Sequence, residues 1–210
     1  MASNIGTEMG VTGVPSFNGR EADRYLTELQ GPEGVQTMAR ILRREPAAYT
    51  VQNAIRLTAR QAKWKSVPAT DAPGDQRAAE FVEQCLGDMS HTLWKAVSFA
   101  LSSQAFGFAD LHIVYKRRSG PVARGSSPTS LFNDGLVGLR KLAIRRQETI
   151  DSWERDDNGD PKFMVQVNPD TGKKLVPVPV DRMLHFIGGD DRGAWEGIGW
   201  LEPAYKLWHM

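Results

Sequence analysis

The hydrophobic pattern of this 210-residue chain changes its period at Gly107, and that change limits the folds available to it. Before Gly107, apolar residues recur at intervals of three and four, which is the spacing of one helical face. After it, Leu111, Ile113 and Tyr115 alternate with polar neighbours, as in a strand with one face in water. The pattern predicts an α+β fold, in which N-terminal helices precede a small, mostly antiparallel sheet.

Prolines and glycines divide the helical part into segments. We expect helices over residues 33–45 and 46–64, the second with a proline in its first turn. A third helix is expected to start at Asp75 as its N-cap, and a fourth to run from Ser90 to Gly107. Residues 1–31 are rich in glycine and form either an irregular arm or a disordered tail, so the domain is expected over residues 32–210.

The part after Gly107 predicts short strands separated by turns. Residues 117–135 are rich in Gly, Ser, Pro and Arg and are expected to form a functional or mobile loop before strand material at residues 136–150. An Asn-Gly turn at residues 156–160 predicts a hairpin, and two prolines place residues 175–179 at a sheet edge. Residues 183–187 predict a last strand, before a final helix at the end of the chain.

No constellation of residues supports catalysis, metal binding or a cofactor site. The single thiol, Cys85, lies on the apolar stripe of a predicted helix, where a buried structural role is favoured and no disulfide can form within the chain. The four histidines are scattered singly, and His185 is interpreted as packed within a strand. An Asp-rich turn lacks the glutamate that a calcium loop needs at its twelfth position, where Val167 stands.

Charge and hydropathy exclude two further classes of protein. The longest uncharged stretch, residues 96–109, is too short and too polar to span a bilayer, so no membrane helix is expected. The formal net charge of +1 is too small for an autonomous domain that binds duplex DNA through bulk charge.

The charge is nevertheless unevenly distributed along the chain. Residues 116–146 hold eight basic residues and one acid, whereas residues 147–170 hold seven acids and two bases. The basic residues are candidates for contact with DNA or with an acidic protein partner, namely Lys116, Arg117, Arg118, Arg124, Arg140, Lys141, Arg145 and Arg146. The alternative is that the basic segment faces the acidic segment of the same chain. A further hypothesis is that the two segments join neighbouring copies of the chain.

Aromatic residues crowd near the end of the chain. The cluster consists of Trp195, Trp200, Tyr205 and Trp208. Such density is favoured where a helix packs on another chain, so these four residues are candidates for a subunit interface. Packing within the domain itself is the alternative.

The order of several short motifs resembles the N-terminal, wing-like part of the portal proteins of tailed bacteriophages, from about Tyr25 to Met210. The motifs are Met38-x-Arg40, Arg44-Glu45-Pro46, Ala62-Lys63-Trp64, Ala105-Phe106-Gly107-Phe108-Ala109-Asp110, Leu184-His185-Phe186, and Gly197-Ile198-Gly199-Trp200-Leu201-x-Pro203-Ala204-Tyr205-x-x-Trp208. Gly199 departs from the serine often found at this step in the family. The family's stem, clip and crown are expected beyond residue 210.

The resemblance implies a structural subunit and no enzyme. Portal proteins form a dodecameric ring at one capsid vertex, the conduit for genome packaging and ejection. The implied partners are identical subunits, the major capsid protein, the terminase large subunit, the head-tail adaptor and the double-stranded DNA in the channel, with no cofactor and no membrane. The implied location is the virion, after synthesis in the cytoplasm of the bacterial host. The rival hypothesis is a standalone phage accessory protein that binds nucleic acid through residues 116–146.

Overall fold

The computed structural model describes residues 16–17, 20–21, 27–122, 128–189 and 194–209. Most of the arm expected over residues 1–31 therefore lies outside the described residues. Two of its described pieces, β1 (Ser16–Phe17) and β2 (Arg20–Glu21), pair antiparallel.

The helices come first in the chain, as predicted. They are α1 (Gly31–Arg44), α2 (Pro46–Arg60), α3 (Pro73–Gly87), α4 (Leu93–Ala100) and α5 (Ser103–Phe106), and α6 (Leu201–His209) follows the strands. Three details differ from the prediction. Helix α2 ends at Arg60, four residues before Trp64, and Asp75 lies inside the first turn of α3 because Ala72 is the N-cap. The expected fourth helix starts after Thr92 and is broken between α4 and α5.

Two three-stranded antiparallel sheets follow α5. The first has the order β4-β3-β8, from β3 (Phe108–Arg117), β4 (Val137–Arg145) and β8 (Met183–Ile187). The second has the order β5-β6-β7, from β5 (Ile150–Arg155), β6 (Pro161–Gln166) and β7 (Val178–Pro179). A 3₁₀ helix, Gln147–Thr149, interrupts the strand expected over residues 136–150. The order of helices and sheets confirms the predicted α+β fold, and β7 confirms the predicted edge.

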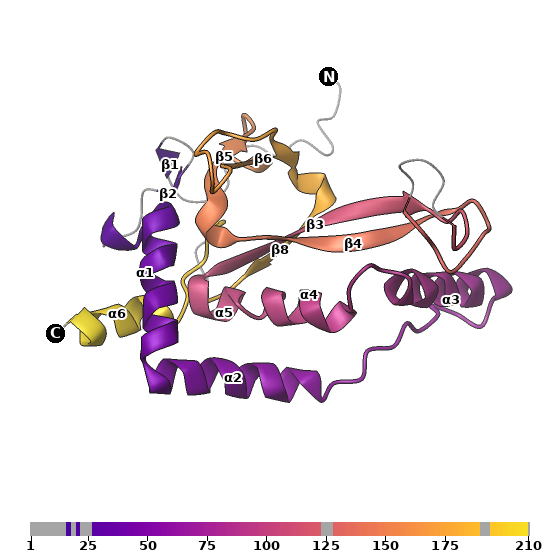
Figure 1. The fold of residues 1–210 in the computed structure, drawn as a ribbon, viewed down its shortest axis with the longest axis horizontal. Coiled ribbons are helices and arrows are strands. Elements are labelled where there is room, and N and C mark those ends of the chain that lie inside the picture. Colours follow the sequence, from indigo (N-terminus) through magenta and orange to yellow (C-terminus); the bar gives the residue numbers. More distant parts are fainter. Residues whose placement is uncertain (1–15, 18–19, 22–26, 123–127, 190–193, 210) are drawn as a thin grey trace, which may run out of the picture.

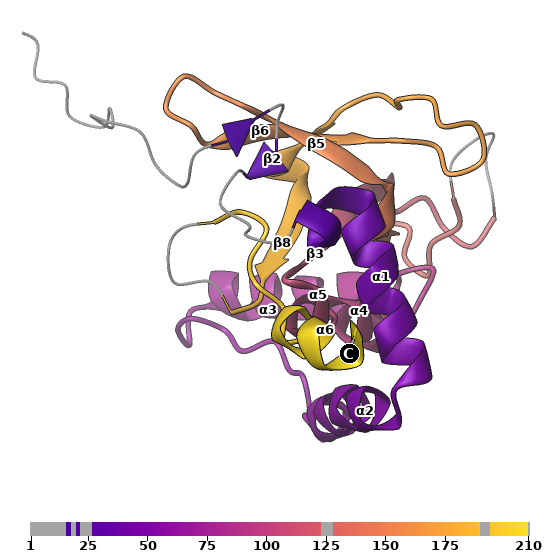
Figure 2. The ribbon, with the colours of Figure 1, turned by 90° about the vertical axis from the view of Figure 1, so that its left-hand side faces the viewer.

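The layers are visible in two perpendicular views. In Figure 1, α2 and α4 lie below the sheet β4-β3-β8, and β5 and β6 lie above it. Figure 2 shows α6 beside α1 and above α2. One core cluster joins α1 to α6, through Met38, Ile41, Leu201 and Tyr205 among others. A second lies between the two sheets, around Trp153 and Met164, and a third lies between α4 and the sheet β4-β3-β8.

The helix-to-strand junction at Gly107 is closely packed against the segment before α6. Gly107 has a φ of 97°, which an L side chain rarely adopts, and it ends α5 as the sequence predicted. A Cβ on Gly199 would lie 2.0 Å from the carbonyl oxygen of Ala105. A Cβ on Gly197 would lie 2.4 Å from the carbonyl oxygen of Gly188. The glycines let three backbone segments approach one another, and this contact positions α6.

Candidate interaction surfaces

The loop after β3 is fixed to the end of α3 by a buried ion pair. The Lys116 ammonium lies 2.9 Å from the Asp88 carboxylate, and it also donates to the carbonyl oxygens of Asp88 and Thr129. The Asp88 carboxylate accepts hydrogen bonds from the Ser130 hydroxyl and the Leu131 N–H. Burial opposes ionisation of Asp88, but these hydrogen bonds and the ammonium outweigh it and lower the pKa of Asp88.

Arg118 holds the other side of the same loop. Its guanidinium carbon lies 4.0 Å from the ring centroid of Phe132 and 4.9 Å from that of Phe81. Its Nη2 donates to the Gln84 side-chain oxygen at 2.7 Å and pairs with Asp134 at 2.9 Å. Arg118 is 1% exposed. Two of the eight basic contact candidates, Lys116 and Arg118, therefore bind within the domain, and the part of the loop that is described is anchored to α3.

The other basic candidates have mixed environments. Arg117, Arg140 and Arg146 are exposed, and Lys141 and Arg145 are half-buried. The Arg145 guanidinium lies 2.8 Å from Nδ1 of His112, and burial, together with this cation, lowers the pKa of His112. Arg124 lies outside the described residues.

The alternative hypothesis was that the basic segment contacts the acidic segment of the same chain, and one such contact is present. Arg146 pairs with Glu148 at 2.6 Å, where the basic segment joins the acidic one. Contact of the exposed cations with DNA or with a protein stays a prediction.

The aromatic residues near the end of the chain pack largely inside the domain. Trp195 stacks on the imidazole of His185, with ring centroids 4.1 Å apart and an interplanar angle of 4°. Tyr205 is buried, and its hydroxyl donates to the Glu28 carboxylate, which raises the pKa of Tyr205. Trp200 and Trp208 are partly buried against the core cluster of α1 and α6. Leu207 beside them is 79% exposed, so this end of the domain keeps an apolar surface.

Asp110 and His185 form a second buried pair, which sequence reasoning did not find. They are directly opposite in the β3–β8 register, and Nδ1 of His185 lies 2.8 Å from Oδ1 of Asp110. Nε2 of His185 lies 2.8 Å from the carbonyl oxygen of Trp195. Burial raises the pKa of Asp110, and the hydrogen bond to His185 opposes that rise. The signal available in the sequence was an acid placed between apolar residues at the start of a predicted strand.

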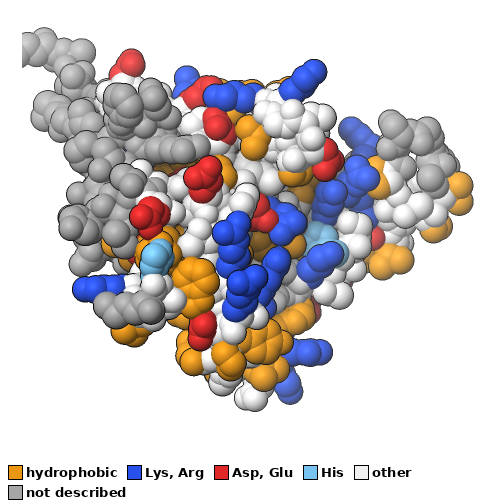
Figure 3. Space-filling model, turned by 60° about the vertical axis from the view of Figure 1, so that its left-hand side comes forward, with side chains coloured by type: hydrophobic (Ala, Val, Ile, Leu, Met, Phe, Trp, Pro, Cys, Tyr) orange, Lys and Arg blue, Asp and Glu red, His pale blue; other side chains and the backbone are white. Residues whose placement is uncertain are grey.

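Two apolar grooves open on the helical side of the domain. One, of about 420 Å³, lies between the α1–α2 corner and α6 and includes Val51, Trp200 and Leu207. The other, of about 740 Å³, lies between α2, α4 and the open edge of β8, and Trp64 and Phe186 are in its walls. Figure 3 shows hydrophobic side chains gathered at the end of one face where α2 and α6 lie, with Lys and Arg side chains grouped above them.

Within the described residues, no group of three or more His, Cys, Asp or Glu side chains is arranged to hold a metal ion. The helices in that part of the chain are all too short or too polar to cross a bilayer. The buried ion pairs and stacked rings serve the packing of the fold, while apolar and basic groups remain on its surface.

The family follows from a comparison with known proteins. A sequence model of the portal protein of Mu bacteriophage matches residues 35–210, and the chain belongs to this family of phage portal proteins. The match confirms the resemblance seen in the motifs. The search of curated proteins finds no match. Portal proteins are structural components of the phage virion that form oligomeric rings and associate with the capsid.

Proposed function

We propose that this chain forms the wing of a portal subunit at one capsid vertex, in a ring through which the genome is packaged and later ejected. The family match over residues 35–210 carries this proposal, because it spans the helices, both sheets and α6. The role requires no reaction at the chain itself. It requires a rigid unit with surfaces for identical copies, the major capsid protein, the terminase large subunit and the head-tail adaptor.

The electrostatics of the chain suit a conduit. A channel wall with a large basic excess would hold duplex DNA by releasing counterions, and it would slow translocation. The formal net charge of this chain is +1, and Lys116 and Arg118 are already bound to carboxylates inside the domain. The surface charge available for tight binding to DNA is therefore smaller than the sequence of residues 116–146 indicates.

The same observation weakens the rival function, a standalone accessory protein that binds nucleic acid through the basic segment. Among the described residues of that segment, the exposed cations available for that function are Arg117, Arg140 and Arg146. Replacement of all three by Ala should leave ring assembly intact if the portal function holds. An accessory DNA-binding protein would instead lose most of its affinity for duplex DNA, with a smaller salt dependence.

A conditional null mutation in the phage gene tests the proposed function. Under restrictive conditions, we expect capsids without genomic DNA, because the ring is the route by which DNA enters. The wild-type gene supplied in trans should restore filled capsids. Filled and infectious particles made without this protein would overturn the proposal. Electron micrographs of the purified wild-type protein provide a second test, in which ring-shaped particles are expected.

A further inference from the structure

Helix α2 and the segment after it form a basic surface without acidic residues. Residues 46–70 contain four cations and no Asp or Glu, and residues 90–109 on the neighbouring α4 side add Lys95 and again no acid. Arg60, Lys63, Lys65 and Lys95 are exposed, and none of the four forms an ion pair with another described residue. A group of like charges that forms no ion pair with a described residue is suited to an acidic partner.

The same surface carries exposed apolar side chains. Helix α2 has 15 residues, of which Ala48 and Gln52 are the buried ones. Leu57 is 60% exposed and lies one turn before Arg60, and Trp64 is 63% exposed between Lys63 and Lys65. We call Leu57, Arg60, Lys63, Trp64 and Lys65 the α2 surface. Arginine and tryptophan beside exposed leucine are the side chains that anchor protein interfaces.

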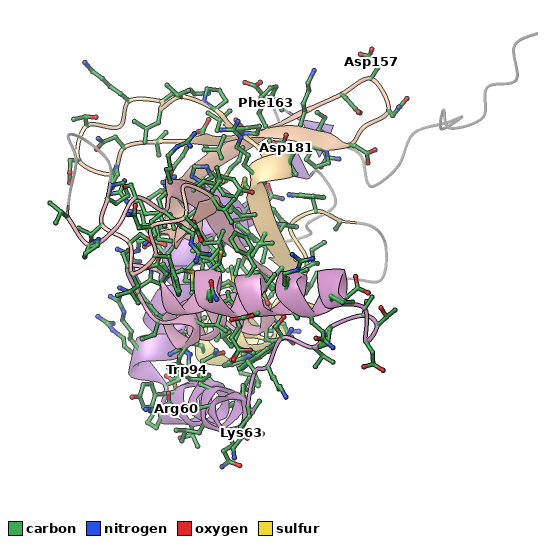
Figure 4. The ribbon with its side chains drawn as sticks, turned by 90° about the vertical axis from the view of Figure 1, so that its right-hand side faces the viewer. Arg60, Lys63, Trp94, Asp157, Phe163 and Asp181 are labelled. Carbon is green, nitrogen blue, oxygen red and sulfur yellow. The ribbon has the colours of Figure 1, made fainter. Side chains whose placement is uncertain are left out.

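Trp94 of α4 contacts the α2 surface through Arg60. The guanidinium carbon of Arg60 lies 5.9 Å from the centroid of the Trp94 ring, which is partly buried. At this distance the cation is attracted to the face of the ring, which favours this position of Arg60. Figure 4 shows Arg60, Lys63 and Trp94 together at one end of the molecule.

The β5–β6 hairpin at the opposite end of the molecule carries an acidic excess. The β5–β6 hairpin holds four acids and two bases over residues 154–162. Its exposed carboxylates are those of Glu154, Asp156, Asp157 and Asp160. Oδ1 of Asp156 accepts hydrogen bonds from the N–H groups of Asn158 and Asp160, so the turn has a fixed shape. In Figure 4, Asp157 and Asp181 lie at the end opposite Arg60 and Lys63.

We propose that the α2 surface of one copy binds the acidic β5–β6 hairpin of the next copy in the ring. This inference rests on the proposed function, since it needs a ring. A closed ring requires two different, complementary patches on each subunit, facing opposite ways. The two patches carry opposite charge, and in Figure 1 they lie on opposite sides of the sheet β4-β3-β8. Opposite charges steer the copies into one register.

In this proposal the α2 surface takes the place of residues 116–146 as the basic side of the interface between copies. Residues 116–146 are the most basic segment in the chain, but Lys116 and Arg118 bind within the domain. The cations of the α2 surface remain free of ion pairs with the described residues. Duplex DNA could also bind these cations, but exposed Leu57 would gain little from a phosphate backbone, and DNA would give the exposed carboxylates of the β5–β6 hairpin no cation to bind. In a ring of copies, the α2 surface and the β5–β6 hairpin of each copy both gain a partner of opposite charge.

Charge reversal tests the interface in the complete natural protein. Either Arg60→Glu with Lys63→Glu or Asp157→Lys with Asp160→Lys should reduce the fraction of copies in rings about tenfold at low salt. The four substitutions together should restore most of the assembly, because the charges again match. Sedimentation and electron micrographs measure the rings, and circular dichroism checks that each variant folds.

The matched control is Arg117→Glu with Arg140→Glu, which changes the net charge as much as reversal of the α2 surface does. It should leave ring assembly at the wild-type level. Loss of assembly in this control equal to that of the α2 variant would overturn the proposal, because net charge alone would then explain both results. Normal rings from both reversal variants would also overturn it. Normal rings combined with weaker binding of duplex DNA would assign the α2 surface to DNA instead.

A cross-link distinguishes failure of this interface from failure of the portal function. Copies with Lys63→Cys mixed with copies with Asp157→Cys should form a disulfide-linked pair on oxidation, whereas each variant alone should not. The native Cys85 is buried and leaves the background low. A wild-type protein that forms no rings would refute the portal function. Wild-type rings together with no cross-link in the mixture would refute this interface alone.

Discussion

Lys116 and Asp88 meet in a buried ion pair across 28 positions of sequence, and each side chain is 4% exposed. The pair lies where β3 leaves the sheet and α3 ends. It gives the described part of the loop after β3 a fixed attachment that its composition did not indicate. Thr129, Ser130 and Leu131 are held against the end of α3 by this attachment.

Removal of the cation should destabilise the domain. Lys116→Met keeps most of the aliphatic stem but leaves the Asp88 charge buried with only the Ser130 and Leu131 hydrogen bonds. We expect a loss of about 3 kcal/mol in the free energy of unfolding, measured by urea titration at pH 7. The neighbouring Arg117→Met, at an exposed position, should change it by less than about 0.5 kcal/mol.

The loss should be partly reversed when the buried charge is removed as well. Asp88→Asn keeps an acceptor for the Leu131 N–H and has no charge to leave unpaired. The double variant Lys116→Met with Asp88→Asn should therefore be more stable than Lys116→Met alone. If the double variant were the less stable of the two, the uncompensated charge would not be the cause of the loss.

The lowered pKa of Asp88 predicts a pH dependence. In the unfolded chain the carboxyl titrates near its ordinary pKa of about 3.9. Because the pKa in the folded state is lower, ionised Asp88 contributes stability above that pH, and the contribution is lost as the pH falls through the folded pKa. Urea midpoints measured between pH 7 and pH 3 should fall less steeply for Asp88→Asn than for wild type. Equal slopes would contradict this assignment.

The elements that sequence predicts well are those that local spacing determines. The period change at Gly107 and the Asn-Gly turn depend on neighbours in sequence, and both are present in the structure. At the break between α4 and α5, the Ser102 hydroxyl accepts a hydrogen bond from the side chain of Gln147 at 2.9 Å, a contact with a distant residue that local spacing does not predict. Lys116 and Arg118 are likewise buried through contacts with Asp88 and Gln84 at the end of α3. The sequence of residues 116–146 alone therefore predicts a basic segment but not the burial of these two cations.

The structure explains why position 199 is a glycine. A Cβ there would lie 2.0 Å from the carbonyl oxygen of Ala105 and 2.7 Å from the backbone nitrogen of Gly107. Gly199→Ser should therefore force the segments apart and cost about 3 kcal/mol of unfolding free energy, measured by thermal or urea unfolding. Gly74→Ser is the matched control, because no atom lies within 4 Å of a Cβ at that position.

The Asp110–His185 pair should tolerate an amide better than it tolerates a deletion. Nδ1 of His185 faces Oδ1 of Asp110, and Nε2 faces the carbonyl oxygen of Trp195, which can only accept. When Nε2 donates to that carbonyl and Nδ1 carries no hydrogen, Nδ1 needs a hydrogen-bond donor at Asp110. The raised pKa of Asp110 favours the protonated acid, which supplies that donor. Asp110→Asn offers an N–H in the same place, and its stability at pH 7 should stay within about 1 kcal/mol of wild type.

Asp110→Ala removes the donor and leaves a small cavity between the sheets, so it should cost about 3 kcal/mol in urea unfolding at pH 7. The pH profile separates this explanation from simple packing. Because the folded pKa of Asp110 is raised, wild type loses stability as the pH rises from about 4 towards that pKa, and Asp110→Asn has no such loss. An amide variant as unstable as the alanine variant would mean that the Asp110 side chain does not act as a hydrogen-bond donor to His185 in the fold.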